Sequence, residues 1–370
     1  MDVSPSIAQD FPDLPPFPDN VPTAPLLRLS LEKLLENDEE ESIRFFTACK
    51  DIGFFYLDLQ GTQEGQSLLQ DADALFDVGS KLFDLPLEEK QSYDFSAQNS
   101  YFGYKGYGTS YIDKTGTLDR NEFYNVSKDT LLSLTPHPLP TPPLLTAHHP
   151  LLTSYTHTAH TLTLLLLTHL NTHLRLPRNL LPSLHALTAP SGDQIRFVRA
   201  PPQPPTDQRT ALGEHTDFGS ITILFNRLGG LQILPPGCEQ KNSSEWKYVR
   251  PLPGHCIVNF GDAMVKFTNG LLRSNIHRVV APPGRQAGEI RYSVVYFSRP
   301  GDEVVLRGLE GDGGGIIPEV DGGGGGGEEG MTAKEWVLRR GVGRRVGRFE
   351  VGREGEWERG MGTERASARI

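Results

Sequence analysis

The stretch HTDFGSITILF, residues 215–225, lies in a region where short β-rich runs follow one another from residue 193 to residue 299. Each run has the length and composition of a strand, and the runs are IRFV (195–198), SITILF (220–225), LQIL (231–234), WKYV (246–249), CIVNF (256–260), HRVV (277–280) and YSVVYF (292–297). Turn residues separate them at GG 229–230, PPG 235–237, PG 253–254 and PPG 282–284. Short strands with such turns and no long helix predict a β-sandwich or a jelly-roll barrel.

Helices are predicted on the N-terminal side of this region. Apolar residues at helical spacing predict helices over 39–52, 64–84 and 151–176, with a strand over 54–59 and Gly53 as the end of the first helix. The segment 96–112 is rich in Gly, Tyr and Ser and is expected to be a loop. The fold class predicted is therefore mainly β, with flanking helices and a jelly-roll core.

The composition along the chain divides it into four parts. They are an N-terminal region (1–130), a Pro-rich connector and helix (131–190), the jelly-roll domain (191–300) and a Gly-rich linker with a C-terminal segment (301–370). The run GGGGGG at 322–327 predicts a flexible linker. Residues 331–340, MTAKEWVLRR, predict a helix, and the Arg-rich tail 344–370 is expected to be a loosely held, solvated surface.

The HTD sequence places two metal-ligand types two residues apart. Residues i and i+2 of a strand project from the same face, so His215 and Asp217 can both point into the mouth of a barrel. The best third ligand is His277, at the start of a later strand. Two His and one carboxylate on one face of a metal leave three positions open, as in non-haem Fe(II) oxygenases. A chance occurrence of His-x-Asp is the alternative.

The sequence RYS, residues 291–293, repeats this spacing in the last β-rich run. Arg291 and Ser293 are expected to share a strand face. A guanidinium fork beside a hydroxyl is a natural binding site for a carboxylate. Either motif alone is weak, because a strand Arg is usually exposed, but the ordered set of H-x-D, His and R-x-S within one β-rich region is specific.

On these residues, the chain resembles the iron- and 2-oxoglutarate-dependent dioxygenases of the isopenicillin N synthase-like branch. The matching blocks are HTDFGSIT (215–222), GGLQIL (229–234), PLPGHCIVNFGD (251–262), FTNG (267–270), SNIHRV (274–279) and RYSVVYFSRP (291–300). Upstream, ACKDIGFFYL (48–57) and LFDLPLEEK (82–90) resemble the N-terminal region of that branch, and TAKEWVLRR (332–340) resembles a C-terminal block of its fungal members.

The resemblance implies a double-stranded β-helix, that is, a jelly-roll core, and specific site roles. His215, Asp217 and His277 would bind Fe(II), and Arg291 and Ser293 would hold the distal carboxylate of 2-oxoglutarate, the cosubstrate. The enzyme would use O2 to hydroxylate, desaturate or cyclise a small organic metabolite, releasing succinate and CO2. A role in the biosynthesis of secondary metabolites is what a fungal-type member implies.

Two other functions remain open from the sequence. An oxidase of the same fold, of the isopenicillin N synthase type, would take all electrons from its substrate and would not use 2-oxoglutarate. A non-catalytic binding protein could also use a jelly-roll scaffold, although the intact H-x-D and His set argues against this reading. Succinate formation separates the first two functions, and iron content separates the third.

The strand before the H-x-D sequence leaves one residue role open. If IRFVRA (195–200) is one strand, Phe197 and Arg199 share one face, and Arg196, Val198 and Ala200 share the other. Arg199 is a possible substrate or cosubstrate contact if its face is inward, and an exposed residue if Arg196 faces the cavity instead. Members of the branch often carry a cosubstrate-binding Tyr where this chain has Ala200.

The histidine-rich segment 137–185 offers a second possible metal site. His169 and His173 are spaced i, i+4 on the predicted helix over 151–176, which could place them on one side of a metal ion. No Glu lies between them and no third ligand is evident nearby. A helix with a polar face is therefore the preferred interpretation.

Charge and cysteine usage restrict partners and compartment. The chain has 36 Lys and Arg against 46 Asp and Glu, a net charge of −10, which argues against nucleic acid or a membrane surface as a partner. The three cysteines are widely spaced and form no C-x-x-C, so a reducing compartment is expected. With no secretory signal and no run long enough to span a bilayer, we expect a cytoplasmic protein. The oligomeric state is left open.

Overall fold

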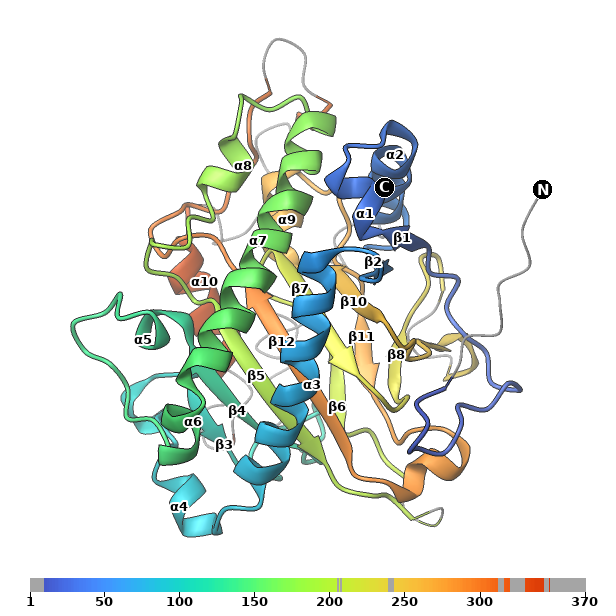
Figure 1. The fold of residues 1–370 in the computed structure, drawn as a ribbon, viewed down its shortest axis with the longest axis vertical. Coiled ribbons are helices and arrows are strands. Elements are labelled where there is room, and N and C mark those ends of the chain that lie inside the picture. The colour runs from blue at the N-terminus through green and yellow to red at the C-terminus, as the bar shows by residue number, and fades with distance from the viewer. Residues whose placement is uncertain are drawn as a thin grey trace.

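The computed structural model describes residues 10–204, 206, 208–238, 243–311, 316–319, 330–342 and 346 (Figure 1). The predicted flexible linker at 322–327 lies outside the described residues, as does the tail 344–370 apart from Val346.

The larger sheet of the described chain has eight strands in the order β1-β2-β10-β7-β12-β5-β4-β3. Their bounds are β1 Arg28–Ser30, β2 Phe54–Asp58, β3 Gly103–Lys105, β4 Glu122–Ser127, β5 Gln194–Ala200, β7 Ile221–Asn226, β10 His255–Phe260 and β12 Arg291–Ser298. β1 and β2 pair in parallel, and the other neighbours pair antiparallel. The strands β1 to β4 come from the N-terminal region, so that region is hydrogen-bonded into the same sheet as the later strands.

The smaller sheet of the described chain has four strands in the order β6-β11-β8-β9. Their bounds are β6 Leu212–His215, β8 Leu231–Ile233, β9 Lys247–Tyr248 and β11 His277–Val279. In the pairing of β11 with β6, His277 lies directly opposite His215. Side chains of both sheets line one cavity between them. The two sheets and their flanking helices confirm the predicted jelly-roll class (Figure 1).

Helices cover the outer face of the larger sheet. The helices are α1 Leu31–Leu35, α2 Glu39–Asp51, α3 Gln63–Phe83, α4 Leu87–Gln91, α5 Lys128–Leu131, α6 Pro143–Ala147, α7 His149–His173, α8 Leu180–Ser183, α9 Asp262–Phe267 and α10 Ala333–Val342, with short 3-10 turns at η1 Ser96–Gln98, η3 Ser243–Glu245 and η4 Gly284–Gly288. Figure 1 shows α3 and α7 side by side in front of β5, β7 and β12. Their buried leucines join the sheet's outer face in the main core.

Local sequence explains where the main helices begin and end. Asp38 and Thr62 cap α2 and α3, because each side chain accepts a hydrogen bond from a backbone N–H of the first turn. Gly53 ends the first of these helices, as predicted. Its φ is +74°, and a Cβ at this position would lie 2.3 Å from the carbonyl oxygen of Arg273. Only glycine fits this turn.

The predicted helices are confirmed within about three residues at each end, but the predicted loop at 96–112 is partly wrong. It contains η1 and the short edge strand β3, which pairs with β4 through Tyr104 and Tyr124. A three-residue strand beginning with glycine has almost no local pattern. Its conformation is set by the neighbouring strand instead.

The histidines of α7 join this helix to α2. The Oγ atom of Ser42 lies 2.8 Å from both His169 Nδ1 and His173 Nε2, and the ring of His173 stacks on Phe46. His169 Nε2–H also donates to the carbonyl of Leu34. These two histidines therefore bridge helices, and His169 is buried and does not lie on the polar face that was expected.

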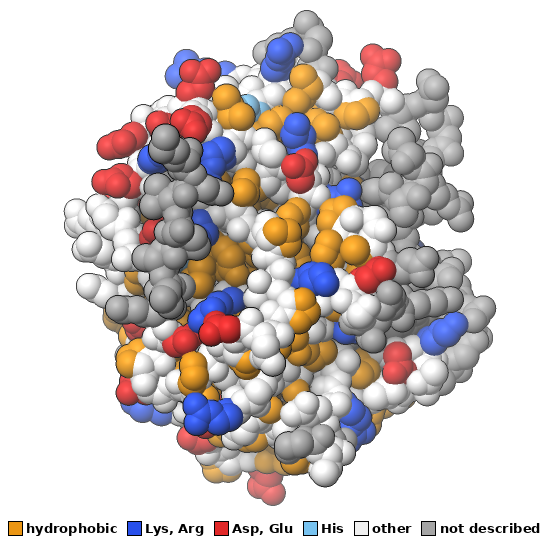
Figure 2. Space-filling view, turned by 90° about the vertical axis from the view of Figure 1, so that its right-hand side faces the viewer, with side chains coloured by type: hydrophobic (Ala, Val, Ile, Leu, Met, Phe, Trp, Pro, Cys, Tyr) orange, Lys and Arg blue, Asp and Glu red, His pale blue; other side chains and the backbone are white. Residues whose placement is uncertain are grey.

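The surface carries mixed charges. On the described part of the face in Figure 2, Lys and Arg side chains are interspersed with Asp and Glu side chains and with hydrophobic ones. Of the helices in the described ranges, none combines the length and the apolar character needed to span a bilayer.

Candidate metal centre and active site

Three predicted ligands converge in the cavity between the sheets. The ligand atoms of His215, Asp217 and His277 all lie within 4.8 Å of one another. Asp217 Oδ1 lies 4.0 Å from Nε2 of His215 and 3.8 Å from Nε2 of His277. Two atoms that each bind one ion at about 2.1 Å lie about 3–4 Å apart, so the spacing fits a single metal ion.

Backbone carbonyls hold both imidazoles in the orientation that a metal needs. His215 Nδ1–H donates to the carbonyl of Gly213 at 2.8 Å, and His277 Nδ1–H donates to that of Asn275 at 3.1 Å. A carbonyl only accepts, so each neutral ring carries its proton on Nδ1 and keeps the Nε2 lone pair for the metal. Both Nε2 atoms face Asp217, and the residues present therefore fit a divalent metal.

The Asp217 carboxylate is fixed through its second oxygen. Oδ2 accepts hydrogen bonds from Thr222 Oγ1 and Asn259 Nδ2, each at 2.6 Å, which leaves Oδ1 toward the histidines. Burial alone raises the pKa of this carboxyl. When they are protonated, the imidazoles of His277 and His215 attract the carboxylate, and together with the two hydrogen bonds they outweigh burial and hold the pKa of Asp217 below its usual value. The carboxyl is thus poised as an anion.

Asp217 was expected to share a strand face with His215, and the structure corrects this expectation. The strand β6 ends at His215, so Asp217 lies in the following turn and is not a strand neighbour of His215. Its orientation comes from Thr222 and Asn259, which belong to β7 and β10. Both residues lie in β-rich runs, and the motifs of the sequence do not mark either of them as a partner of Asp217.

Arg291 and Ser293 face the same cavity, as expected. The Arg291 side chain is only 4% exposed; its Nε donates to the carbonyl of Gly229 at 2.7 Å and its Nη1 to Ser293 Oγ at 2.8 Å. In the described part of the chain, no carboxylate forms an ion pair with it. Burial lowers the pKa of Arg291 to about 10, so it remains charged at neutral pH. A buried cation without a counter-ion is a strong anion-binding group.

The cavity around these groups is mostly apolar and continues past the metal ligands. Its walls come from both sheets and include Phe54, Val198, Ala200, Leu224, Leu231, Val279, Val295 and Phe297. A second hollow shares Arg196, Leu212 and His215 with it and extends toward Tyr111, Phe218 and the helix α10. His215 therefore lies where the two spaces meet.

The register of β5 against β12 decides which arginine faces inward. Ala200 pairs with Arg291 and Val198 pairs with Ser293, so the inward face of β5 carries Arg196, Val198 and Ala200. Arg196 lies between the rings of Phe123 and Phe297, at 4.3 and 4.8 Å from their centroids. It is therefore the β5 arginine that borders the metal cavity.

The possible role of Arg199 as a substrate or cosubstrate contact is wrong. Its side chain lies on the outer face of β5, where it pairs with Glu122 at 2.6 Å and with Asp84 at 3.2 Å. Phe197 shares this face and touches α3 at Gly79. The outward alternative, with Arg196 facing the cavity, is the one the structure adopts.

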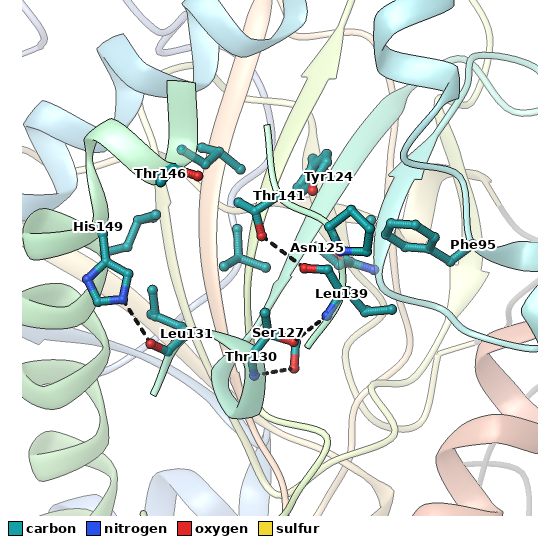
Figure 3. Close-up of a pocket in the computed structure, with 15 residues that line it drawn as sticks. Phe95, Tyr124, Asn125, Ser127, Thr130, Leu131, Leu139, Thr141, Thr146 and His149 are labelled. Carbon is teal, nitrogen blue, oxygen red and sulfur yellow. Dashed lines mark hydrogen bonds between the residues drawn. The ribbon is translucent and has the colours of Figure 1, made fainter. Parts of the chain in front are cut away.

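Another cavity, shown in Figure 3, lies on the opposite side of β4 between α5, α6 and α7. Its lining is largely apolar, with Phe95, Leu131 and Leu139 among the wall residues. The His149 imidazole in it is bonded through Nε2 to the carbonyl of Leu131 at 2.9 Å. Among the described residues that line this cavity, His149 is the only His, Cys, Asp or Glu, so they form no second metal site.

The donor set and the jelly-roll fold together define a non-haem Fe(II) oxygenase. Comparison with known proteins then gives the family. The family model for the 2OG-Fe(II) oxygenase superfamily matches residues 182–300, and the one described as non-haem dioxygenase in morphine synthesis N-terminal matches residues 24–143. The chain belongs to the Fe(II)- and 2-oxoglutarate-dependent dioxygenases, and His215, Asp217 and His277 are its metal triad.

Curated relatives are similar in sequence to this chain over most of its length. A 2-oxoglutarate-dependent dioxygenase of Aspergillus fumigatus is 35% identical over 310 residues, which cover 80% of each chain. The 2-oxoglutarate-dependent dioxygenase gloE of Glarea lozoyensis is 31% identical over 288 residues, covering 78% of this chain and 83% of that protein.

Solved structures support the fold. A full-length Neurospora crassa protein in complex with alpha-KG matches with a TM-score of 0.68 at 22% identity, covering 85% of this chain and 95% of that one. JOX2 in complex with 2OG, Fe and JA matches with a TM-score of 0.63 at 20% identity and 95% coverage of both chains.

Replacing Arg199 by alanine is expected to leave kcat and KM for 2-oxoglutarate within about twofold of wild type, because its side chain lies outside the cavity. The loss of its bonds to Glu122 should lower the free energy of unfolding by about 1–3 kcal/mol. Urea unfolding and steady-state kinetics check both parts. Arg196→Ala, on the opposite face of the same strand, is the matched variant and should lower kcat/KM. A tenfold loss of kcat/KM in Arg199→Ala would contradict the outward placement.

Proposed function

We propose that this dioxygenase hydroxylates, desaturates or cyclises a small organic metabolite in the biosynthesis of secondary metabolites. One observation carries the proposal for its cosubstrate site. Arg291, a buried arginine that has no counter-ion among the described residues, lies in the same cavity as the three metal ligands. A cavity that holds both a metal centre and an anion-binding arginine suits a dicarboxylate, with one carboxylate at the metal and the other at Arg291.

In this proposal, Arg291 and Ser293 bind the distal carboxylate of 2-oxoglutarate. Two side-chain bonds already orient the guanidinium, and Ser293 pairs across the sheet with Val198, which keeps its hydroxyl at the cavity wall. Ala200 lies opposite Arg291, where related enzymes often carry a tyrosine. The small side chain leaves the anion site to the arginine and the serine.

The remaining residues orient and shield the reaction. Bound Fe(II) supplies the redox chemistry that couples O2 and 2-oxoglutarate to the oxidation of a substrate C–H bond. His215, Asp217 and His277 would hold that ion, and the hydrogen bonds to Asp217 prevent its carboxylate from rotating away. The apolar side chains of Leu224, Leu231 and Val295 line the same cavity and would limit the access of water. The hollow toward Tyr111 and Phe218 would hold the substrate.

The product balance tests this function. The purified protein is reconstituted with Fe(II) without oxygen, then given O2, 2-oxoglutarate and a panel of small metabolites. We expect one succinate and one CO2 for each substrate molecule that gains an oxygen atom or loses two hydrogen atoms. Substrate oxidation without succinate would identify an oxidase of the isopenicillin N synthase type. A failure to bind iron would identify a binding protein.

The proposal also covers the division of the chain into regions and its location in the cell. We propose that residues 191–300 form the catalytic unit, with 1–130 as an N-terminal region built onto it, 131–190 as the connector and helix, and 301–370 as the linker and C-terminal segment. We also propose a cytoplasmic location, because Cys49, Cys238 and Cys256 are free thiols.

A further inference from the structure

The helix α10 is anchored directly against the segment that carries two of the metal ligands. Ala333, Trp336 and Val337 are buried in the main core. The indole Nε1–H of Trp336 donates to the carbonyl of Phe218 at 3.1 Å. Because Phe218 follows Asp217 in the chain, the C-terminal helix contacts the backbone next to the metal site.

A buried triangle of polar side chains strengthens this contact. Arg340 of α10 forms an ion pair with Asp262, the first residue of α9, with Nη1 at 2.5 Å from Oδ2. Arg340 Nη2 also donates to Thr216 Oγ1 at 3.3 Å, and this hydroxyl donates to Asp262 Oδ2 at 3.0 Å. Both charged side chains are at most 1% exposed. Three segments far apart in the sequence thus meet at Thr216.

The triangle acts on the metal ligands through the backbone. Thr216 is the residue between His215 and Asp217, so its side-chain bonds restrain the peptide groups on both sides. The backbone N–H of Asp262 donates to the carbonyl of Asp217 at 2.8 Å. Asp262 therefore holds Thr216 by its side chain and Asp217 by its backbone, and Arg340 holds the Asp262 carboxylate in place.

Energetics favours a positional role for this ion pair. A buried ion pair can often be replaced by well-packed apolar residues without loss of stability, because desolvation of the two charges offsets their attraction. What apolar residues do not provide is a directional bond to Thr216. The same helix also lines the hollow beside His215, through Val337, Arg340 and Gly341.

We propose that Arg340 is a positioning residue for the metal centre. Acting through Asp262 and Thr216, it keeps the H-T-D segment in the geometry that places His215 and Asp217 around one ion, so α10 is a required part of the active site. The inference rests on the proposed function only in that the triad must bind a metal.

The test uses the full chain and cobalt as a spectroscopic probe. The apo protein is titrated with Co(II) without oxygen, and the visible d–d bands report affinity and ligand geometry. In Arg340→Met we expect about tenfold weaker Co(II) binding with altered bands, and a tenfold or larger fall in kcat for succinate formation. KM for 2-oxoglutarate should stay within about twofold, because Arg291 is untouched. Lys334→Met, at an exposed position of α10, is the matched control and should behave as wild type.

A second variant keeps the inference falsifiable if Arg340→Met does not fold. Thr216→Val removes the hydroxyl at nearly constant volume and should produce the same spectral change, and combining both variants should add little because they break one network. Wild-type Co(II) affinity and bands in a folded Arg340→Met or in Thr216→Val would overturn the positioning role. Absence of metal binding in the wild type itself would instead overturn the proposed function.

Discussion

Replacing Asp217 by alanine is expected to reduce 2-oxoglutarate turnover at least a hundredfold and to abolish Fe(II) binding at ordinary metal concentrations. Asp217 is the one anionic ligand of the triad, and its loss leaves two neutral imidazoles to balance a divalent charge. A hundredfold loss corresponds to about 2.7 kcal/mol of transition-state stabilisation. Iron content after anaerobic reconstitution and succinate formation are the two measurements.

Two controls make this result specific to the metal. Asp217→Asn keeps the size of the side chain but not its charge, and it should lose iron as the alanine variant does. Asp73→Ala removes an exposed carboxylate from α3 and should retain full activity. Circular dichroism should show the same fold for all three variants. Turnover above a tenth of the wild-type value in Asp217→Ala would remove this residue from the ligand set.

The second large effect is expected at Arg291. Arg291→Lys keeps a positive charge but loses the planar fork that binds a carboxylate through two parallel bonds. We expect KM for 2-oxoglutarate to rise about ten- to a hundredfold, with iron binding within twofold of wild type. Initial rates at varied 2-oxoglutarate concentration, together with iron content, separate the two effects.

The matched control for this substitution is Arg199→Lys, a change of the same kind on the outer face of the neighbouring strand. It should leave KM for 2-oxoglutarate unchanged. If Arg291→Lys also leaves KM unchanged while Arg196→Lys raises it, the anion site lies at Arg196 and the proposed role of Arg291 and Ser293 is wrong.

Much of this protein was predictable because its patterns are local. Short β-rich runs bounded by turn residues are enough to place β5, β7, β10 and β12, because the length and composition of a strand and the turns beside it are local properties. Gly53 similarly marks the end of the first predicted helix. The metal ligands could be found because the ordered set of H-x-D, a later His and R-x-S within one β-rich region is specific.

Other features depend on contacts between distant segments. Asp217 is oriented by Asn259, which is 42 positions away, and Thr216 is held by Arg340, which is 124 positions away. No periodicity links such residues, because each pair forms only when separate elements pack together. The short strand β3 is of the same kind, since its conformation comes from pairing with β4.

By itself, then, the sequence determined the strands β2, β5 and β7 to β12, the long helices and the residue types of the metal site. Only the tertiary structure decided which face of β5 lines the cavity. A strand pattern of period two is the same viewed from either side, so it does not distinguish Arg196 from Arg199. The pairing of Ala200 with Arg291, and the close approach of α3 to Phe197, break that symmetry and turn Arg196 inward.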